Sequence, residues 1–239
     1  MAARQKYLEV LELDPVREST KANIASINAT INSVDIAVQK FERPIVEGDK
    51  SARALANRGL AYFSFGDAGR GVEDMTRASQ LRGADAQISV DLALAYLSTN
   101  QPEKAVEVAS TIVEKFPAAS AKAHEVRAWA FVLLRDGMSA FSNASVSLGN
   151  ARNWNARTFR RDKAAYRVLA GYIGLRQSDR GAHADDFLRT WQQHASPDVW
   201  PDAMIAYLLG NINEKQLVNI AMRSAESDGG IALAEAPSF

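Results

Sequence analysis

Residues 52–85 (ARALANRGLAYFSFGDAGRGVEDMTRASQLRGAD) and 86–117 (AQISVDLALAYLSTNQPEKAVEVASTIVEKFP) read as two copies of one unit. Gly59 and Tyr62 lie in the first copy, and Ala93 and Tyr96 occupy the same places in the second. The shift between the copies is constant, because 93 − 59 and 96 − 62 both equal 34. Small residues that recur at such a period are typical of stacked helical hairpins. Each small side chain lets two antiparallel helices approach closely.

The same spacing extends beyond these two copies. In five successive units, a small residue in the expected first helix is followed by another in the expected second helix, as in 71 − 59 = 12. The expected ends of the units also recur 34 residues apart (49 − 15 = 34), at Pro15, Asp49, Gly83 and Pro117. The five pairs of small residues are Ala25/Ala37, Gly59/Gly71, Ala93/Ala105, Ala128/Ala140 and Ala170/Ala182.

These residues resemble the tetratricopeptide repeat (TPR), and Leu13-Asp14-Pro15 is similar to the usual end of the second TPR helix. The resemblance implies an all-α fold, a right-handed superhelical solenoid of antiparallel helical hairpins. It also implies a role in protein–protein interaction, with the first helix of each hairpin lining a concave groove. An array without polar caps exposes apolar ends, so self-association is a further expectation.

We predict four parts of the chain. Residues 1–15 form the second helix of a partial N-terminal repeat, and residues 16–153 form four TPR-like repeats. Residues 154–195 hold an inserted loop, whose polar stretch begins at Asn150 and runs to Arg161, and a divergent fifth repeat. Residues 196–239 form two additional helices and a truncated segment, and we expect the natural protein to continue past both ends. Pro44 should kink or end its helix near Arg43.

The C-terminal part departs from the repeat pattern. Trp200-Pro201 should open a short helix through about Leu209, and Asn213 with Gln216 predicts a capping box that starts a helix over residues 214–225. Residues 199–217 resemble the linker of bacterial envelope TPR lipoproteins of the new-lipoprotein-I type. The lipid-bearing cysteine of those proteins is absent here, and the resemblance leaves both the bacterial cytoplasm and the periplasm open.

Composition excludes several classes of function. Lys plus Arg and Asp plus Glu both number 28, so no overall positive field favours nucleic acid. With 0 cysteines, disulfides and thiolate chemistry are excluded. No apolar run in the sequence approaches the roughly 18 residues that a transmembrane helix needs.

The sequence contains no enzyme signature, so we predict no catalytic residue, no cofactor and no metal. We expect solvated or capping roles for the histidines, and a turn with a helix contact for the glycines that superficially resemble a phosphate loop. The neighbouring carboxylates should point apart on solvated helix faces. These residues are His124, His183, His194; Gly66, Gly69, Gly71; and Glu73/Asp74 with Asp185/Asp186.

Two surfaces are candidate binding sites. The repeat register places seven residues on the first-helix face, where an apolar peptide or an amphipathic helix would bind. Packing among these side chains is the other interpretation. A basic cluster would hold an anion or an acidic partner segment, or would be a solvated loop. The groove residues are Asn57, Leu60, Phe63, Leu94, Leu97, Trp129 and Val132, and the basic cluster is Arg157, Arg160, Arg161, Lys163 and Arg167, preceded by Arg152.

We therefore predict a non-catalytic scaffold or adaptor that binds a partner protein, with a bacterial envelope or secretion complex as its setting. The alternative is the helical regulatory or substrate-recruiting part of a larger enzyme.

Overall fold

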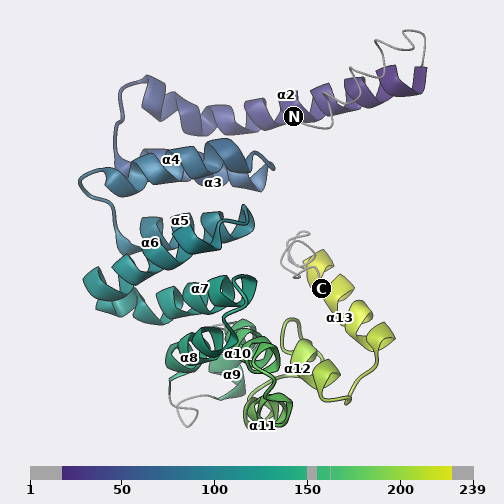
Figure 1. Cartoon of the computed structure of the whole chain (residues 1–239). Coiled ribbons are helices and arrows are strands. Elements are labelled where there is room, and N and C mark those ends of the chain that lie inside the picture. The colour runs from purple at the N-terminus through teal and green to yellow at the C-terminus, as the bar shows by residue number, and fades with distance from the viewer. Residues whose placement is uncertain (1–17, 150–154, 162, 228–239) are drawn as a thin grey trace. The chain divides into compact units, whose positions relative to one another are not determined.

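The computed structural model describes residues 18–149, 155–161 and 163–227, and every regular element within these ranges is a helix (Figure 1). The chain divides into two compact units, unit 1 through Ile88 and unit 2 from Ser89. The prediction of an all-α fold is confirmed. The helix predicted before Pro15 and the segment after residue 227 lie outside the described residues.

Four pairs of helices form hairpins, and each pair is joined by a connection of three residues (68 − 64 − 1 = 3). Connections this short make the two helices of a pair antiparallel neighbours. The pairs are α3 (Ala52–Ser64) with α4 (Ala68–Gln80), α5 (Ala86–Ser98) with α6 (Pro102–Lys115), α7 (Ser120–Leu133) with α8 (Gly137–Leu148), and α10 (Ala165–Gln177) with α11 (Gly181–Gln192).

All four connections have the same backbone turn. Its middle residue is left-handed, with φ of 83° at Gly66, 54° at Asn100, 57° at Arg135 and 56° at Asp179. The next backbone N–H donates back to a carbonyl of the first helix, as in Asp67 N to Tyr62 O at 2.8 Å and Arg180 N to Leu175 O at 3.0 Å. This is the Schellman motif, which satisfies carbonyls that a helix end otherwise leaves unpaired.

Small residues let helices approach at the predicted positions. A Cβ on Gly59 would lie 3.0 Å from the carbonyl oxygen of Gly71, and a Cβ on Gly71 would lie 3.0 Å from that of Gly59. The closest approach lies between hairpins of unit 2, where a Cβ on Gly137 would lie 2.2 Å from the carbonyl oxygen of Gly174. Backbone fills the space that any side chain would need there.

The first predicted hairpin is not present. Residues 18–46 form one continuous helix, α2 (Glu18–Val46), where residues 16–49 were expected to fold back on themselves (Figure 1). No glycine or proline interrupts the chain between Glu18 and Arg43, so nothing in this stretch forces a break. The helix continues one turn past Arg43, with Pro44 in its last turn, and ends in a left-handed turn at Gly48 (φ 106°).

The fifth unit has a different register from the predicted one. Ala182, the expected contact residue, is exposed, whereas Ala184 is fully buried. The turn explains the shift. In every hairpin, the residue after the left-handed one is followed, four positions later, by the buried small residue of the second helix (71 − 67 = 4, 184 − 180 = 4). Ala170 is buried too, but it packs with Ala128 and Ala144 of the preceding hairpin.

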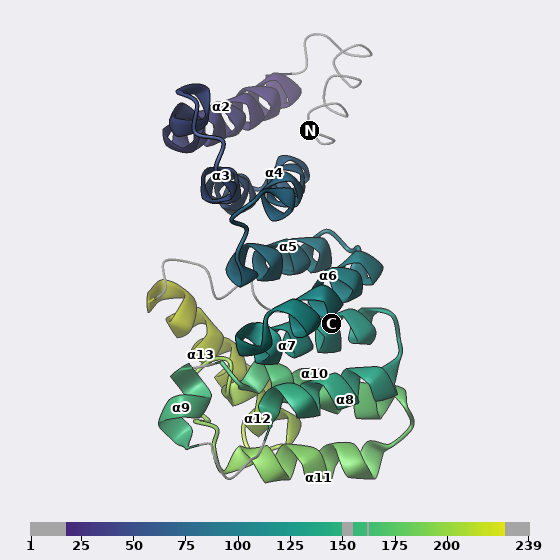
Figure 2. The ribbon, with the colours of Figure 1, turned by 90° about the vertical axis from the view of Figure 1, so that its left-hand side faces the viewer.

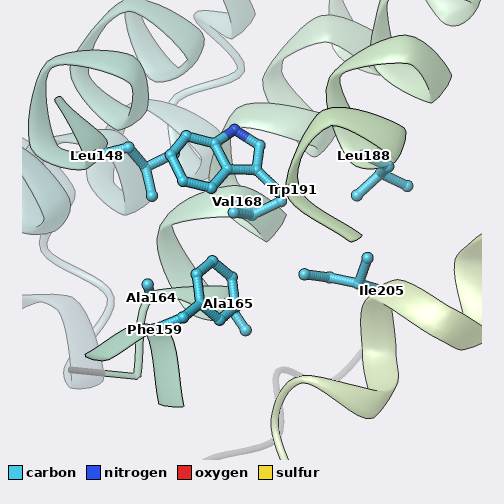
Figure 3. Close-up of a cluster of buried hydrophobic side chains, with 8 residues drawn as sticks. All are labelled: Leu148, Phe159, Ala164, Ala165, Val168, Leu188, Trp191 and Ile205. Carbon is cyan, nitrogen blue, oxygen red and sulfur yellow. The ribbon is translucent and has the colours of Figure 1, made fainter. Parts of the chain in front are cut away.

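The predicted loop before the fifth hairpin is partly helical. Residues 156–161 form α9 (Ala156–Arg161), which Asn155 and Thr158 cap by reciprocal hydrogen bonds of 3.0 and 3.1 Å. Phe159 is fully buried in a core that α8, α9, α10, α11 and α12 (Ala203–Leu208) share (Figure 3). One buried aromatic residue therefore makes a helix of a polar stretch, since burying Phe contributes about 1.5–3 kcal/mol.

Both helices predicted in the C-terminal part are present, but the first begins at Ala203, and Trp200-Pro201, which was expected to open it, lies in a turn before the helix. The expected short helix is α12, and the capping box starts α13 (Glu214–Ser227) through Asn213 N to Gln216 Oε1 at 2.9 Å and Gln216 N to Asn213 Oδ1 at 3.0 Å. Ile205 of α12 joins the core around Phe159. Within unit 2, α10 packs against both α8 and α11, and α11 lies below the other two in Figure 2.

The close approach at Gly137 predicts an asymmetric pair of glycine substitutions. Gly137→Ala should lower the free energy of unfolding by about 1–3 kcal/mol, because the new methyl group meets the Gly174 carbonyl. Gly69→Ala has Asp67 Oδ1 as its nearest neighbour at 3.7 Å and should raise the free energy of unfolding by up to about 1 kcal/mol. Urea unfolding followed by circular dichroism measures both. Equal effects would contradict the contact.

The register of the fifth hairpin predicts a second asymmetry. Ala184→Leu should destabilise the protein by about 1–3 kcal/mol, since Ala184 is fully buried. Ala182→Leu, two residues earlier on the same helix, should change the free energy of unfolding by less than about 0.5 kcal/mol, since Ala182 is exposed. Thermal melting compares them, and the opposite order would restore the register predicted from the sequence.

Candidate protein-interaction surface

In unit 1, the predicted groove residues lie on α3 and differ in what they contact. Asn57 is exposed, and Leu60 is 40% exposed. Phe63 is half-buried, and its ring leans over the α4 backbone so closely that a Cβ on Gly71 would lie 2.5 Å from a ring carbon. Leu60 therefore has a larger exposed fraction than Phe63, whose ring also takes part in the contact between the two helices of the hairpin.

In unit 2, the predicted groove residues divide in the same way. Leu94 of α5 is 39% exposed, and Leu97 is half-buried. Trp129 and Val132 of α7 pack against a buried cluster of three alanines, Ala128, Ala144 and Ala170. Part of each side chain therefore supports the stack, and part remains on the first-helix face. Packing, the second interpretation of these residues, applies to Trp129 and Val132, and the binding groove stays a prediction.

Three charged residues meet beside this apolar surface. Glu125 of α7 accepts a hydrogen bond at Oε1 from the Lys122 ammonium at 2.6 Å and at Oε2 from Arg167 Nε of α10 at 2.7 Å. The Glu125 and Arg167 side chains are almost fully buried, whereas the Lys122 side chain is 43% exposed. The carboxylate thus joins α7 to α10 and holds Lys122 at the surface.

This arrangement divides the predicted basic cluster. Arg167 is buried and paired with Glu125, so its guanidinium does not face solvent with the rest of the cluster. Arg157 and Lys163 are exposed. The side chains of Arg160 and Arg161, and all of Arg152, lie outside the described part of the structure.

A second buried pair lies within unit 1. Arg58 of α3 donates two hydrogen bonds to Asp74 of α4, at 2.6 and 2.7 Å, and this bond raises the pKa of the Arg58 guanidinium despite its partial burial. Asp74 was expected on a solvated face but is buried, while Glu73 beside it is exposed as predicted. A carboxylate buried without this partner would be strongly unfavourable.

A cationic side chain lies over the ring of each repeat tyrosine, a contact that was not predicted from the sequence. Arg70 lies 4.3 Å from the centre of the Tyr62 ring, and Lys104 lies 5.4 Å from that of Tyr96. The sequence separation is identical in both repeats (70 − 62 = 8, 104 − 96 = 8). A search for a tyrosine followed eight residues later by a cation would therefore have found both contacts. Burial and a hydrogen bond to Glu42 of α2 raise the pKa of the Tyr62 hydroxyl.

The remaining candidates for chemistry have structural surroundings. His124 hydrogen-bonds Asn143 at 2.9 Å, and His183 is exposed. His194 packs against the rings of Phe159 and Trp191 instead of standing in solvent. Among the described residues, no three histidine or acidic side chains form a group that could hold a metal ion, and no helix is long and apolar enough to cross a membrane.

One pocket lies away from the predicted surface. It has a volume of about 350 Å³ and lies in unit 1, where the ends of α2 and α4 meet the start of α3. Its apolar lining residues are Ile45, Leu55 and Leu81, and Asp49, Lys50, Arg77 and Gln80 complete it. None of the seven predicted groove residues lines this pocket.

Comparison with solved structures identifies the fold. The chain is similar to a tetratricopeptide repeat protein from Parabacteroides merdae ATCC 43184, with a TM-score of 0.57 over 94% of this chain and 85% of that chain. The fold is TPR-like. The sequence identity is 11%, so the likeness shows the fold alone. No protein-family model matches this TPR-like chain, and no curated protein matches its sequence.

Proposed function

We propose that this chain is a non-catalytic scaffold that binds a partner protein on the first-helix faces of its hairpins. The partner segment is an apolar peptide or an amphipathic helix. The observation that carries the proposal is the pair of leucines, Leu60 and Leu94, at the same place in two hairpins (94 − 60 = 34). Each keeps about two fifths of its surface in solvent, whereas the apolar residue three positions later, Phe63 or Leu97, is half-buried, as expected for a docking position.

A narrower form of the proposal concerns the setting. The resemblance of residues 199–217 to envelope TPR lipoproteins favours an adaptor in a bacterial envelope or secretion complex. A regulatory or substrate-recruiting part of a larger enzyme is the alternative, and it would use the same faces. Sequencing the natural gene on both sides of this chain distinguishes the two settings, because the alternative requires a catalytic domain in the same reading frame.

The faces can be tested without a known partner. Peptides are first selected against the whole chain from a random peptide library, and their affinities are then measured by fluorescence anisotropy. The double variant Leu60→Ser/Leu94→Ser should bind the selected peptides at least about tenfold more weakly, because it removes the exposed apolar side chain from a first-helix face in each unit. Circular dichroism should stay helical, because both leucines are already exposed.

The matched control is Val46→Ser/Val146→Ser. It removes two apolar side chains that are 83% and 56% exposed, one in each unit, and neither lies on the first helix of a hairpin. This control should bind as the wild type does. Equal loss in both double variants, or no loss in the leucine variant, would contradict the proposal.

A further inference from the structure

On the first-helix face of unit 2, charged residues lie next to the apolar ones along α7. Lys122, Glu125, Trp129 and Val132 lie along one side of α7, because their spacings of three, four and three residues (125 − 122, 129 − 125, 132 − 129) follow the helical repeat. The stripe begins with charge and ends with apolar side chains. A segment lying on the tryptophan end would therefore have its flank beside Lys122.

The charge at that end is cationic. Glu125 is the acidic residue of α7, and both its oxygens are occupied, Oε1 by Lys122 and Oε2 by Arg167. Lys122 therefore shares its carboxylate with a second cation, and one hydrogen bond uses only one of the three donors of its ammonium. With its side chain 43% exposed, Lys122 can donate to a further carboxylate without leaving Glu125.

Neighbouring charges do not reverse this pattern. Asp91 is the acidic residue in the part of α5 that belongs to unit 2, and it is half-buried and has an interaction partner of its own. In the part of α5 that belongs to unit 2, the exposed residues are Leu94 and Ser98, and neither carries a charge. An acidic side chain on the partner would thus meet an ammonium, and a basic one would meet the same ammonium as a like charge.

We infer that the first-helix face of unit 2 binds an acidic amphipathic helix, whose apolar side chains pack on Leu94, Leu97 and Trp129 and whose flanking carboxylate pairs with Lys122. This inference rests on the proposed function and adds the charge of the partner. Glu125 and Arg167 act as positioning residues, because their buried ion pair holds the Lys122 ammonium beside the apolar stripe.

Two synthetic amphipathic peptides test the inference. They share one leucine and phenylalanine face and differ only in the residues that flank it, glutamate in one and lysine in the other. Fluorescence anisotropy against the whole chain should give about three- to tenfold tighter binding of the glutamate peptide at low salt, and the difference should shrink as salt screens the charges.

Variants assign the preference to one residue. Lys122→Glu should abolish or reverse the preference. Lys122→Gln should abolish it without adding a carboxylate beside Glu125, which guards against a folding defect. Lys115→Glu is the matched control, because it makes the same charge change at an exposed position on α6 and should leave the preference intact.

The outcomes separate the two proposals. Equal binding of both peptides, tighter binding of the lysine peptide, or a preference that survives Lys122→Gln would overturn the acidic partner while leaving the docking face in place. Failure of both peptides to bind would count against the docking face itself, and the acidic partner would fall with it.

Discussion

One left-handed residue in each hairpin turn decides where the second helix begins and which of its sides packs. The turn closes the first helix with a Schellman hydrogen bond, and the second helix then starts at a fixed place. In each hairpin, the buried small residue comes four positions after the residue that directly follows the left-handed one. The position of the turn therefore decides which side of the second helix packs against the first. Glycine adopts this conformation easily, but Arg135 and Asp179 adopt it at a cost of about 1–2 kcal/mol. Packing of the two helices must offset that cost.

This turn also explains what the sequence could predict. The regular units were found because Gly59/Gly71 and Ala93/Ala105 keep one spacing. The capping box was found because it is local: the side chains of Asn213 and Gln216 each accept a hydrogen bond from the other residue's backbone N–H. The fifth register was missed because alanines stand at both 182 and 184, and burial alone distinguishes them. Composition does not tell which arginine or aspartate will take a left-handed turn.

Interactions between distant residues account for the other differences. Asp74 and Arg167 look like solvated charges in sequence, and each is buried because a partner sixteen (74 − 58) or 42 (167 − 125) residues away completes an ion pair. Phe159 makes a helix of a polar stretch because α11 and α12 supply its neighbours. Of the candidate surface, the apolar positions followed from helical spacing. The charge beside them did not, because it depends on how Glu125 is shared between Lys122 and Arg167.

Amide hydrogen exchange tests the central claim, which is that the same turn repeats in all four hairpins. The amides of Asp67, Gln101, Asp136 and Arg180 donate to carbonyls of the preceding helix, at 2.8 to 3.0 Å. Each should exchange slowly, immediately before the fast amides of the next helix's first turn. A protected amide at Arg180 is the decisive result, because it fixes the fifth hairpin in the register that buries Ala184. Fast exchange at Arg180, with protection two residues earlier at Ser178 as the last slow amide, would contradict the account.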